Sequence, residues 1–203
     1  MVRRGVIALP FALGAGGGAL GLGTEGFRIF TSEGVRRAAV VRAPRDLPDV
    51  PLEDQDGRRF RLAELRGRVV LMEFIYTRCA TLCLALGSTF QQLRERIARA
   101  HPGAGVQLLT VSFDPAYDDP LRLAEFAERH GGAGPDWCFA RPLDDRALAA
   151  LLAVCGIVVR PDRYGGFDHN AAIHLIDRAG RLARVLGPAA IDQAMIELGR
   201  HLA

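Results

Sequence analysis

The chain has 203 residues, of which 49% are hydrophobic and 24% are charged, and its formal net charge is +3. This length and apolar content exclude a disordered protein, and the small charge without a long basic run does not support a nucleic-acid partner. Lysine is absent, so a P-loop lysine, a Schiff-base lysine and a lysine general base are excluded. Four cysteines are too few for a disulfide scaffold but enough for one site.

An uncharged stretch, residues 5–23, follows Arg3 and Arg4 at the N-terminus. A short basic region before an apolar segment is typical of an export signal, and 19 uncharged residues also suffice for an uncleaved anchor. Pro10 and seven glycines weaken a spanning helix, whereas no clear A-x-A cleavage site follows. We therefore expect residues 1–23 to be a signal peptide or an N-terminal membrane anchor, with the anchor preferred. The two arginines would stay cytoplasmic, which places the rest of the chain outside the cytoplasm.

Residues 24–46 mix charged and small side chains without a sustained period, which indicates a tether. The folded domain is expected over residues 47–203. It opens with two short strand-like runs on either side of the turn at 54–57, a pattern that predicts a hairpin. The run VVLMEFIY over 69–76 is almost continuously apolar and therefore predicts a central strand that is buried on both faces.

The later elements alternate between helical and strand-like patterns. In chain order we expect a helix over 82–97, a strand over 106–113, a helix around 123–127, an edge strand over 137–140, a helix over 148–155, strands over 171–177 and 182–186, and a final helix over 191–202. This order predicts an α/β, thioredoxin-like fold in which helices cover both faces of a central mixed sheet.

Cys79 and Cys83 fall where the buried strand ends and the first long helix begins. Two thiols four residues apart in the first turn of a helix lie on one face, close enough to form a disulfide or to bind one metal ion. The free backbone N–H groups at a helix start also lower the pKa of a thiol. Two buried structural cysteines are the alternative, but the polar neighbours Thr77 and Arg78 argue against it.

The C-x-x-x-C spacing of this pair bears on its chemistry. It is one residue longer than the C-x-x-C pair of thioredoxin-type redox catalysts. Two thiolates on one helical turn suit a soft ion of low coordination number such as Cu(I), whereas a structural zinc ion needs two further ligands. Cys138 and Cys155 are poor candidates for those ligands because apolar residues surround each of them in the sequence, as is typical of packing residues.

A histidine is the best candidate for a third ligand. His101, His130 and His201 stand at predicted helix ends or at the chain terminus, where histidines are commonly solvated. His169 and His174 are five residues apart, so on one straight strand they would face opposite ways. His174 lies inside an apolar strand, whereas His169 lies in a polar loop from which its side chain can reach a neighbouring loop. We therefore prefer His169 as the ligand, with His174 as the alternative.

Three blocks of the sequence resemble the Sco/SenC family. They are FIYTRC-x-x-x-C over 74–83, LTVSFDP over 109–115 with DP at 119–120, and DHN over 168–170 leading into LID-x-x-G over 175–180. Members of this family are thioredoxin-fold copper proteins, usually membrane-anchored, of the bacterial cell envelope and the mitochondrial inner membrane. They take part in assembling the copper centre of cytochrome c oxidase. The resemblance covers residues 47–203, and Asp114 belongs to the family pattern in a role that we leave open.

The resemblance implies that Cys79, Cys83 and His169 are ligands of copper, as Cu(I) or Cu(II). One departure concerns the residue after each cysteine. The family commonly has proline at both positions, whereas this chain has Ala80 and Leu84. Proline is well suited to the first turn of a helix and stiffens the loop before it, so its loss leaves the ligands in place but is expected to loosen the site or to shift its redox behaviour.

Two functions follow as hypotheses. The first is a copper metallochaperone of the periplasm, anchored in the inner membrane or exported, whose copper acceptor is a protein such as a cytochrome c oxidase subunit. The second is a thiol-disulfide oxidoreductase that reduces the cysteines of a periplasmic partner, with Cys79 and Cys83 as the redox pair and no need of a histidine. Because a partner must have reduced thiols before it can accept copper, the two activities can coexist. A peroxiredoxin is disfavoured, since Cys79 lacks the P-x-x-x-T-x-x-C setting of its peroxidatic cysteine.

Overall fold

The computed structural model of the chain describes residues 32–79 and 81–203. The predicted signal peptide or anchor, residues 1–23, lies outside this part of the chain. Within the part that is described, no helix is both long and apolar enough to cross a membrane.

The chain divides into two compact units, with the boundary after Arg42. The first contains helix α2 (Ser32–Arg42), and the second begins with strand β1 (Arg45–Asp46), which pairs with strand β10 (Arg181–Leu186). Both α2 and β1 lie in residues 24–46, where the sequence pattern indicates only a tether. Helix α2 is rich in arginine and alanine, which favour helices but give no apolar stripe along one face. A strand of two residues such as β1 is too short to show an alternating pattern, so hydrophobic periodicity predicts neither element.

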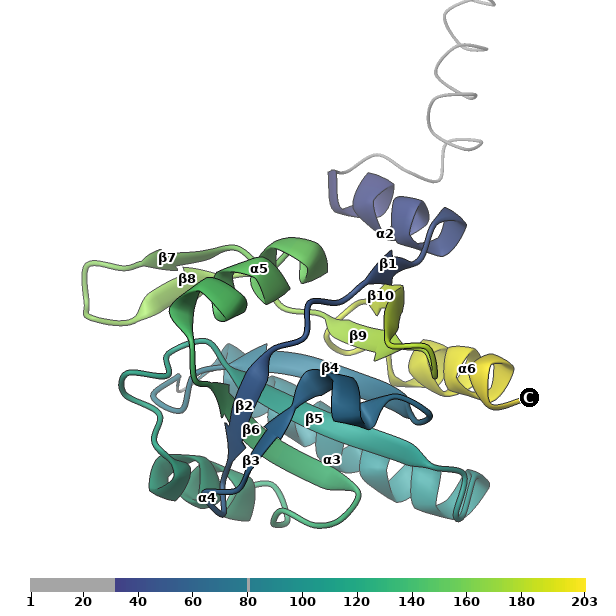
Figure 1. The fold of residues 1–203 in the computed structure, drawn as a ribbon, viewed down its shortest axis with the longest axis horizontal. Helices are drawn as coiled ribbons and strands as arrows, with labels where there is room; N and C mark the ends of the chain where they lie inside the picture. The colour runs from purple at the N-terminus through teal and green to yellow at the C-terminus, as the bar shows by residue number, and fades with distance from the viewer. Residues whose placement is uncertain (1–31, 80) are drawn as a thin grey trace, which may run out of the picture. The chain divides into compact units, whose positions relative to one another are not determined.

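An eight-stranded mixed sheet forms the centre of the second unit, in the order β1-β10-β9-β4-β5-β6-β2-β3 (Figure 1). β4 (Val69–Ile75) is parallel to β5 (Val106–Ser112) and antiparallel to β9 (Ile173–Ile176). The remaining strands of this sheet are β2 (Pro51–Asp54), β3 (Arg59–Arg61) and β6 (Trp137–Pro142). β2 and β3 form the predicted hairpin.

Every predicted helix of the domain is present. They are α3 (Leu82–Ala100), α4 (Pro120–Glu128), α5 (Asp145–Cys155) and α6 (Ile191–Leu202), and a short 3-10 helix, η1 (Leu62–Leu65), precedes β4. All seven residues of β4 are buried, as its continuous apolar run predicts. Both faces of the sheet must therefore be covered.

Contacts from the sheet show which helices cover each face. On one side, Trp137 of β6 packs against Phe90 of α3, with ring centroids 6.2 Å apart. On the other side, the Nε2 atom of His174 in β9 lies 3.2 Å from the backbone carbonyl oxygen of Cys155 in α5. Helices thus lie on both faces, and α3 runs behind β5 in Figure 1. The predicted layer arrangement is confirmed.

β6 is an interior strand, so the prediction of an edge strand over residues 137–140 is wrong. Its outer side pairs with β2, where Leu52 lies opposite Pro142. The same pairing brings together Glu53 and Arg141, which are 88 residues apart and form a salt bridge of 2.6 Å. A contact between segments so distant in sequence leaves no local pattern from which it could be predicted.

A second sheet has only two strands, β7 (Val159–Pro161) and β8 (Phe167–His169), which form a hairpin that the sequence pattern does not predict (Figure 1). His169 is the last residue of β8 and lies opposite Val159, so its assignment to a loop is wrong. The glycines and aspartates around β8 favour turns, which hides a strand of three residues.

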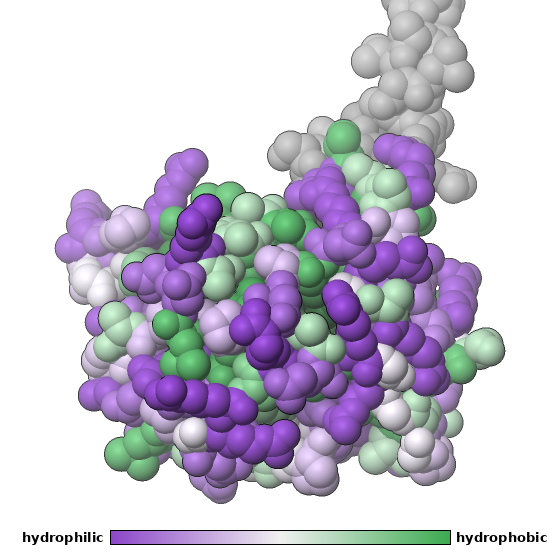
Figure 2. Space-filling model, viewed as in Figure 1, coloured by the Kyte–Doolittle hydropathy of each residue, from purple (hydrophilic) through white to green (hydrophobic). Residues whose placement is uncertain are grey.

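The core lies between the sheet and its helices, and hydrophilic side chains cover most of the face shown in Figure 2. His130, just after α4, belongs to this core because it is only 3% exposed and its ring packs against Phe126. Burial lowers its pKa. The expectation of a solvated histidine at this helix end is therefore wrong. The ring fits because α3 has a glycine, Gly87, where it approaches: a Cβ atom there would lie 2.6 Å from the imidazole.

Replacing Gly87 with alanine is expected to destabilise the protein by about 1–3 kcal/mol, because the added methyl group overpacks the buried His130 ring. The matched control is Gly199→Ala in α6, where a new Cβ meets no atom within 4 Å. That variant should gain about 0.5–1 kcal/mol from helix propensity. Denaturant midpoints of the two variants measure both effects. Equal stabilisation by the two substitutions would contradict the tight contact.

Candidate metal and redox site

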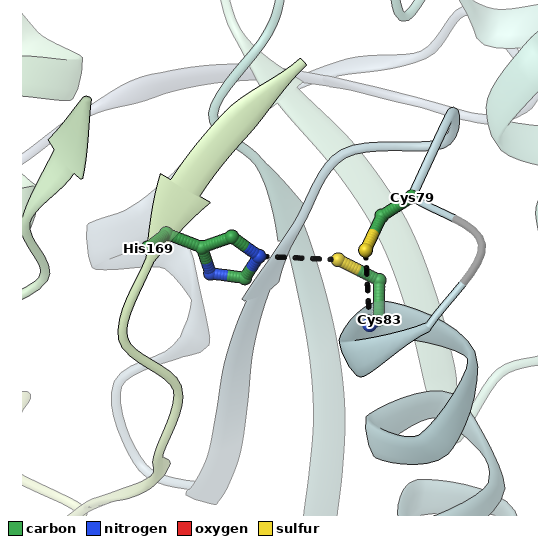
Figure 3. Close-up of side chains that lie close together, drawn as sticks. All are labelled: Cys79, Cys83 and His169. Carbon is green, nitrogen blue, oxygen red and sulfur yellow. Dashed lines mark hydrogen bonds between the residues drawn. The ribbon is translucent and has the colours of Figure 1, made fainter. Parts of the chain in front are cut away.

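Residues 76–83, which we term the cysteine loop, lead from the carboxyl end of β4 into the first turn of α3. The N-cap of α3 is Thr81, so Cys83 lies in the first turn whereas Cys79 precedes the helix. The prediction that both thiols lie in this turn is wrong for Cys79. The backbone N–H of Cys83 donates to Cys79 Sγ at 3.4 Å (Figure 3). An unpaired amide at a helix start is thereby used to stabilise a thiolate. Both thiols are free.

The β7–β8 hairpin brings His169 to the same place. Its Nε2 atom lies 3.6 Å from Cys83 Sγ, although the two residues are 86 positions apart in the chain (Figure 3). The ligand atoms of Cys79, Cys83 and His169 all lie within 4.8 Å of one another. The structure therefore brings together the three residues that the sequence analysis selects.

The His169 ring is oriented by a backbone contact. Its Nδ1 atom lies 3.1 Å from the carbonyl oxygen of Asn170, which can only accept, so we assign the ring proton to Nδ1. Nε2 then presents its lone pair to the cysteines, as a metal-binding imidazole must. Burial lowers the pKa of His169, which favours the neutral ring at pH 7.

The two thiols differ in ionisation. Burial alone would raise the pKa of Cys79, but hydrogen bonds from the backbone N–H groups of Cys83 and Thr81 outweigh it and lower that pKa. Burial raises the pKa of Cys83 well above its ordinary value, and the nearby charges of Cys79 and Glu73 add to this effect. Cys79 is 7% exposed and Cys83 is fully buried. The pair therefore has one slightly exposed thiol with a lowered pKa and one fully buried thiol with a raised pKa.

Aromatic rings form the wall of the site behind His169. The centroid of Phe113 lies 4.9 Å from that of the imidazole, and the centroid of Tyr76 lies 5.8 Å from it. Phe167 packs edge-on against both Phe113 and Tyr76, and its backbone N–H donates to Tyr76 Oη at 3.4 Å. These contacts hold β8 against the cysteine loop. These residues have no distinct signal in the sequence, because aromatic side chains at strand ends are indistinguishable from core residues.

A buried carboxylate holds the start of the cysteine loop. Asp118 accepts hydrogen bonds from the backbone N–H and the hydroxyl of Thr77, at 3.1 and 2.6 Å, and from Ser112 Oγ at 2.5 Å. Burial raises its pKa in spite of these bonds. Asp118 is missed by the sequence analysis. The sequence nevertheless contains a usable signal for Asp118. Because β4 and β5 are parallel, the polar residues that follow the two strands meet at one edge of the sheet.

The remaining histidines and cysteines lie elsewhere. His174 is fully buried, with its ring nitrogens 3.3 and 3.2 Å from the backbone oxygens of Met72 and Cys155, so it does not enter the site. Of the two histidines that the sequence leaves as candidates, His169 therefore lies beside the cysteine pair and His174 does not. Cys155 is a core residue, as predicted. Cys138 packs against the core, and burial raises its pKa to about 12.

The arrangement offers two soft sulfur donors and one neutral nitrogen donor to a single ion. Leu84, where the family resemblance would place a proline, packs against the core from the first turn of α3. Its apolar side chain thus anchors the turn that carries Cys83. The site residues fit a soft, three-coordinate metal, and the two cysteines also fit a dithiol–disulfide pair.

Comparison with known sequences identifies relatives over most of the chain. Residues 48–202 match the sequence model of the family described as SCO1/SenC. The SCO1 protein homolog of Bacillus subtilis is 25% identical over 134 residues, which make up 65% of this chain and 68% of that protein.

Comparison with solved structures shows the same fold. BsSco, described as a member of the Sco family of cytochrome c oxidase assembly proteins with a disulfide switch, matches with a TM-score of 0.70 and 20% identity, over 79% of this chain and 95% of that one. Bradyrhizobium japonicum ScoI with copper bound matches with a TM-score of 0.60 and 23% identity, over 77% of this chain and 99% of that one. The predicted thioredoxin-like fold is confirmed.

Proposed function

Since this chain belongs to the SCO1/SenC family, we propose that it binds one copper ion through Cys79, Cys83 and His169 and passes the ion to a protein in the assembly of cytochrome c oxidase. The observation that carries this proposal is the convergence of the three donor atoms, all within 4.8 Å of one another, from segments 86 residues apart. The copper bound to ScoI of B. japonicum supports copper as the ion.

The donor set explains how the ion would be held and released. Thiolate is the soft ligand that selects Cu(I), and imidazole binds both oxidation states. His169 is ready to bind without losing a proton from Nε2, whereas each cysteine must first lose the proton of its thiol. A three-coordinate ion leaves room for an incoming ligand, so copper can move to an acceptor by stepwise exchange of ligands. Cys79, the less buried of the two cysteines, is the sulfur ligand that an acceptor reaches first.

The predicted N-terminal segment fits this function. Residues 1–23 would either hold the domain, residues 47–203, at the inner membrane facing the periplasm or export it to the periplasm, with residues 24–46 as the tether. A cytochrome c oxidase subunit is the kind of copper acceptor that this placement would serve.

A second function is carried by the cysteine pair alone, and the disulfide switch of BsSco favours it. In this reaction the Cys79 thiolate attacks a partner's disulfide and forms a mixed disulfide, while one partner sulfur leaves as thiolate. Cys83 then loses its proton and attacks Cys79 Sγ, which releases the second partner thiolate. The partner is reduced by two electrons, and the chain is left with a Cys79–Cys83 disulfide.

Copper titration of the purified, reduced full chain tests the first function. We expect one copper per chain to be retained against a mild chelator, with thiolate-to-copper charge transfer in the absorption spectrum. His169→Ala is expected to weaken copper binding by at least about 100-fold, since loss of a supporting group alone costs 10- to 100-fold. His101→Ala is the matched control, because His101 caps the far end of α3 and should leave binding unchanged.

The same variants separate the two functions. If the native protein retains no copper while disulfide reductase activity survives in His169→Ala, the metallochaperone proposal fails in favour of the oxidoreductase. Loss of copper in both His169→Ala and His101→Ala would instead indicate non-specific binding by surface histidines.

A further inference from the structure

Arg78, the residue before Cys79, contacts two segments that are distant in the sequence. Its Nη2 atom forms a salt bridge of 2.6 Å with Asp114 Oδ2, just after β5. Its Nη1 atom donates to the backbone carbonyl oxygen of Gly165 at 3.2 Å. Gly165 belongs to the turn that joins β7 to β8, so Arg78 links the cysteine loop directly to the hairpin that carries His169.

The guanidinium group is held in place from several sides. Its Cζ atom lies 4.2 Å from the ring centroid of Tyr117, which lies in the same loop as Asp114. The Asp114 side chain is only 12% exposed, and that of Arg78 is 38% exposed. The backbone N–H of Asp114 in turn donates to Ser112 Oγ, at the end of β5. The Arg78 side chain is exposed, but its planar guanidinium group is paired with a largely buried carboxylate and stacked on a ring, and both contacts fix its direction.

The hairpin needs such support because it is a separate two-stranded sheet. An isolated hairpin of two strands is marginally stable in water. One end of it is held by Asn170, which bonds to the backbone of Val158 and Gly156. The start of β8, next to the turn, packs on Tyr76 through Phe167. The turn at the opposite end accepts the hydrogen bond from Arg78. This bond connects the cysteine loop to the hairpin and thereby restrains the position of β8.

We propose that Arg78 is a positioning residue that sets the distance between His169 and the cysteine pair by tying the β7–β8 turn to the cysteine loop. This inference rests on the proposed copper-binding function. Arg78 itself contacts none of the three ligand atoms, and Asp114 gives its guanidinium the direction needed to reach Gly165. Without the hydrogen bond between Arg78 and Gly165, the hairpin moves more freely and the His169 imidazole contributes less to copper binding. The copper ion is then held mainly by the two sulfur ligands.

A double-mutant cycle tests whether Arg78 acts through His169. Arg78→Ala is expected to weaken copper binding 10- to 100-fold in the native background, as loss of an outer-shell partner does. In a His169→Ala background, the same substitution should change affinity by less than about 3-fold, because there is no imidazole left to position. Arg78→Lys keeps the charge but cannot contact Asp114 and Gly165 as a fork, and is expected to stay weakened.

Arg122→Ala is the matched control. The Arg122 guanidinium lies over the same Tyr117 ring at 4.3 Å, but its hydrogen bonds are to Asp119 and the Tyr117 backbone. It should leave copper affinity unchanged. A second readout needs no copper: amide hydrogen exchange over residues 159–169 of the copper-free full chain is expected to accelerate in Arg78→Ala and not in Arg122→Ala.

The outcomes are separable. Equal loss of affinity on Arg78→Ala in both backgrounds, or full rescue by Arg78→Lys, would show that Arg78 acts by charge and would overturn the inference. Failure of the native protein to bind copper would overturn the proposed function. Hydrogen exchange would still test whether Arg78 restrains the β7–β8 hairpin. Unchanged exchange over residues 159–169 in Arg78→Ala would refute this restraint.

Discussion

Alkylation of the reduced protein at pH 7 is expected to modify Cys79 at least about 100-fold faster than Cys83, since two pKa units of difference already give this ratio of thiolates. The pKa of Cys79 is lowered by backbone N–H donors, whereas burial raises that of Cys83. Accessibility acts in the same direction, since Cys83 is fully buried. Time-resolved labelling with iodoacetamide, followed by peptide mass spectrometry, measures both rates in one sample.

Cys138 serves as an internal control for this experiment. It is partly exposed, but burial raises its pKa to about 12, so it should also react slowly at pH 7. The alkylation rate of Cys79 should rise with pH over a lower pH range than the alkylation rate of a thiol with an ordinary pKa. Labelling of Cys83 as fast as Cys79 would contradict the assignment of Cys79 as the attacking thiol and as the first copper ligand that a partner reaches.

Replacement of Glu73 by glutamine is expected to stabilise the folded protein by about 3 kcal/mol at pH 7. Glu73 lies in β4 and is completely buried. Its Oε1 atom accepts a hydrogen bond of 2.6 Å from Thr110, whereas Oε2 has no partner among the residues that the structure describes. Burial raises its pKa from the ordinary value of 4.5 to about 8. A glutamine keeps the acceptor for Thr110 and cannot ionise.

The sign of the pH dependence follows from these two pKa values. Between pH 4.5 and about pH 8 the folded state keeps a proton on Glu73 that the unfolded chain has lost. The free energy of unfolding of the native protein therefore falls as the pH rises through this window. Glu73→Gln removes this part of the slope, so its advantage should shrink below about 1 kcal/mol at pH 5.

Urea denaturation at pH 5 and pH 7 measures this effect. Glu125→Gln, an exposed glutamate on α4, is the control and should change stability by less than about 0.5 kcal/mol at either pH. A gain from Glu73→Gln that is equal at both pH values would show that packing, and not ionisation, is responsible. Ionisation of Glu73 also bears on the site, because its negative charge is one of the causes that raise the pKa of Cys83.

The helices and the central strands could be predicted because their signals are local. Apolar residues spaced three or four apart mark α3, and an unbroken apolar run marks β4, whatever the rest of the chain does. The interior position of β6 could not be predicted, because it depends on pairing with β2, which comes from the far end of the domain. The buried His130 could not be predicted either, because the space for its ring comes from Gly87 on another helix.

The candidate site divides in the same way. From the sequence, Cys79 and Cys83 can be paired because they lie four residues apart between a buried strand and a helix, although the helix begins only at Leu82 and Cys79 precedes it. The tertiary structure alone brings His169, and not His174, to the two cysteines and places Arg78, Asp118 and the aromatic residues around them. The contacts of Thr77 with Asp118, of Cys83 with His169 and of Arg78 with Gly165 join residues that are 41, 86 and 87 positions apart. Their distances depend on how parallel strands and a short hairpin pack together, and no spacing along the chain encodes that.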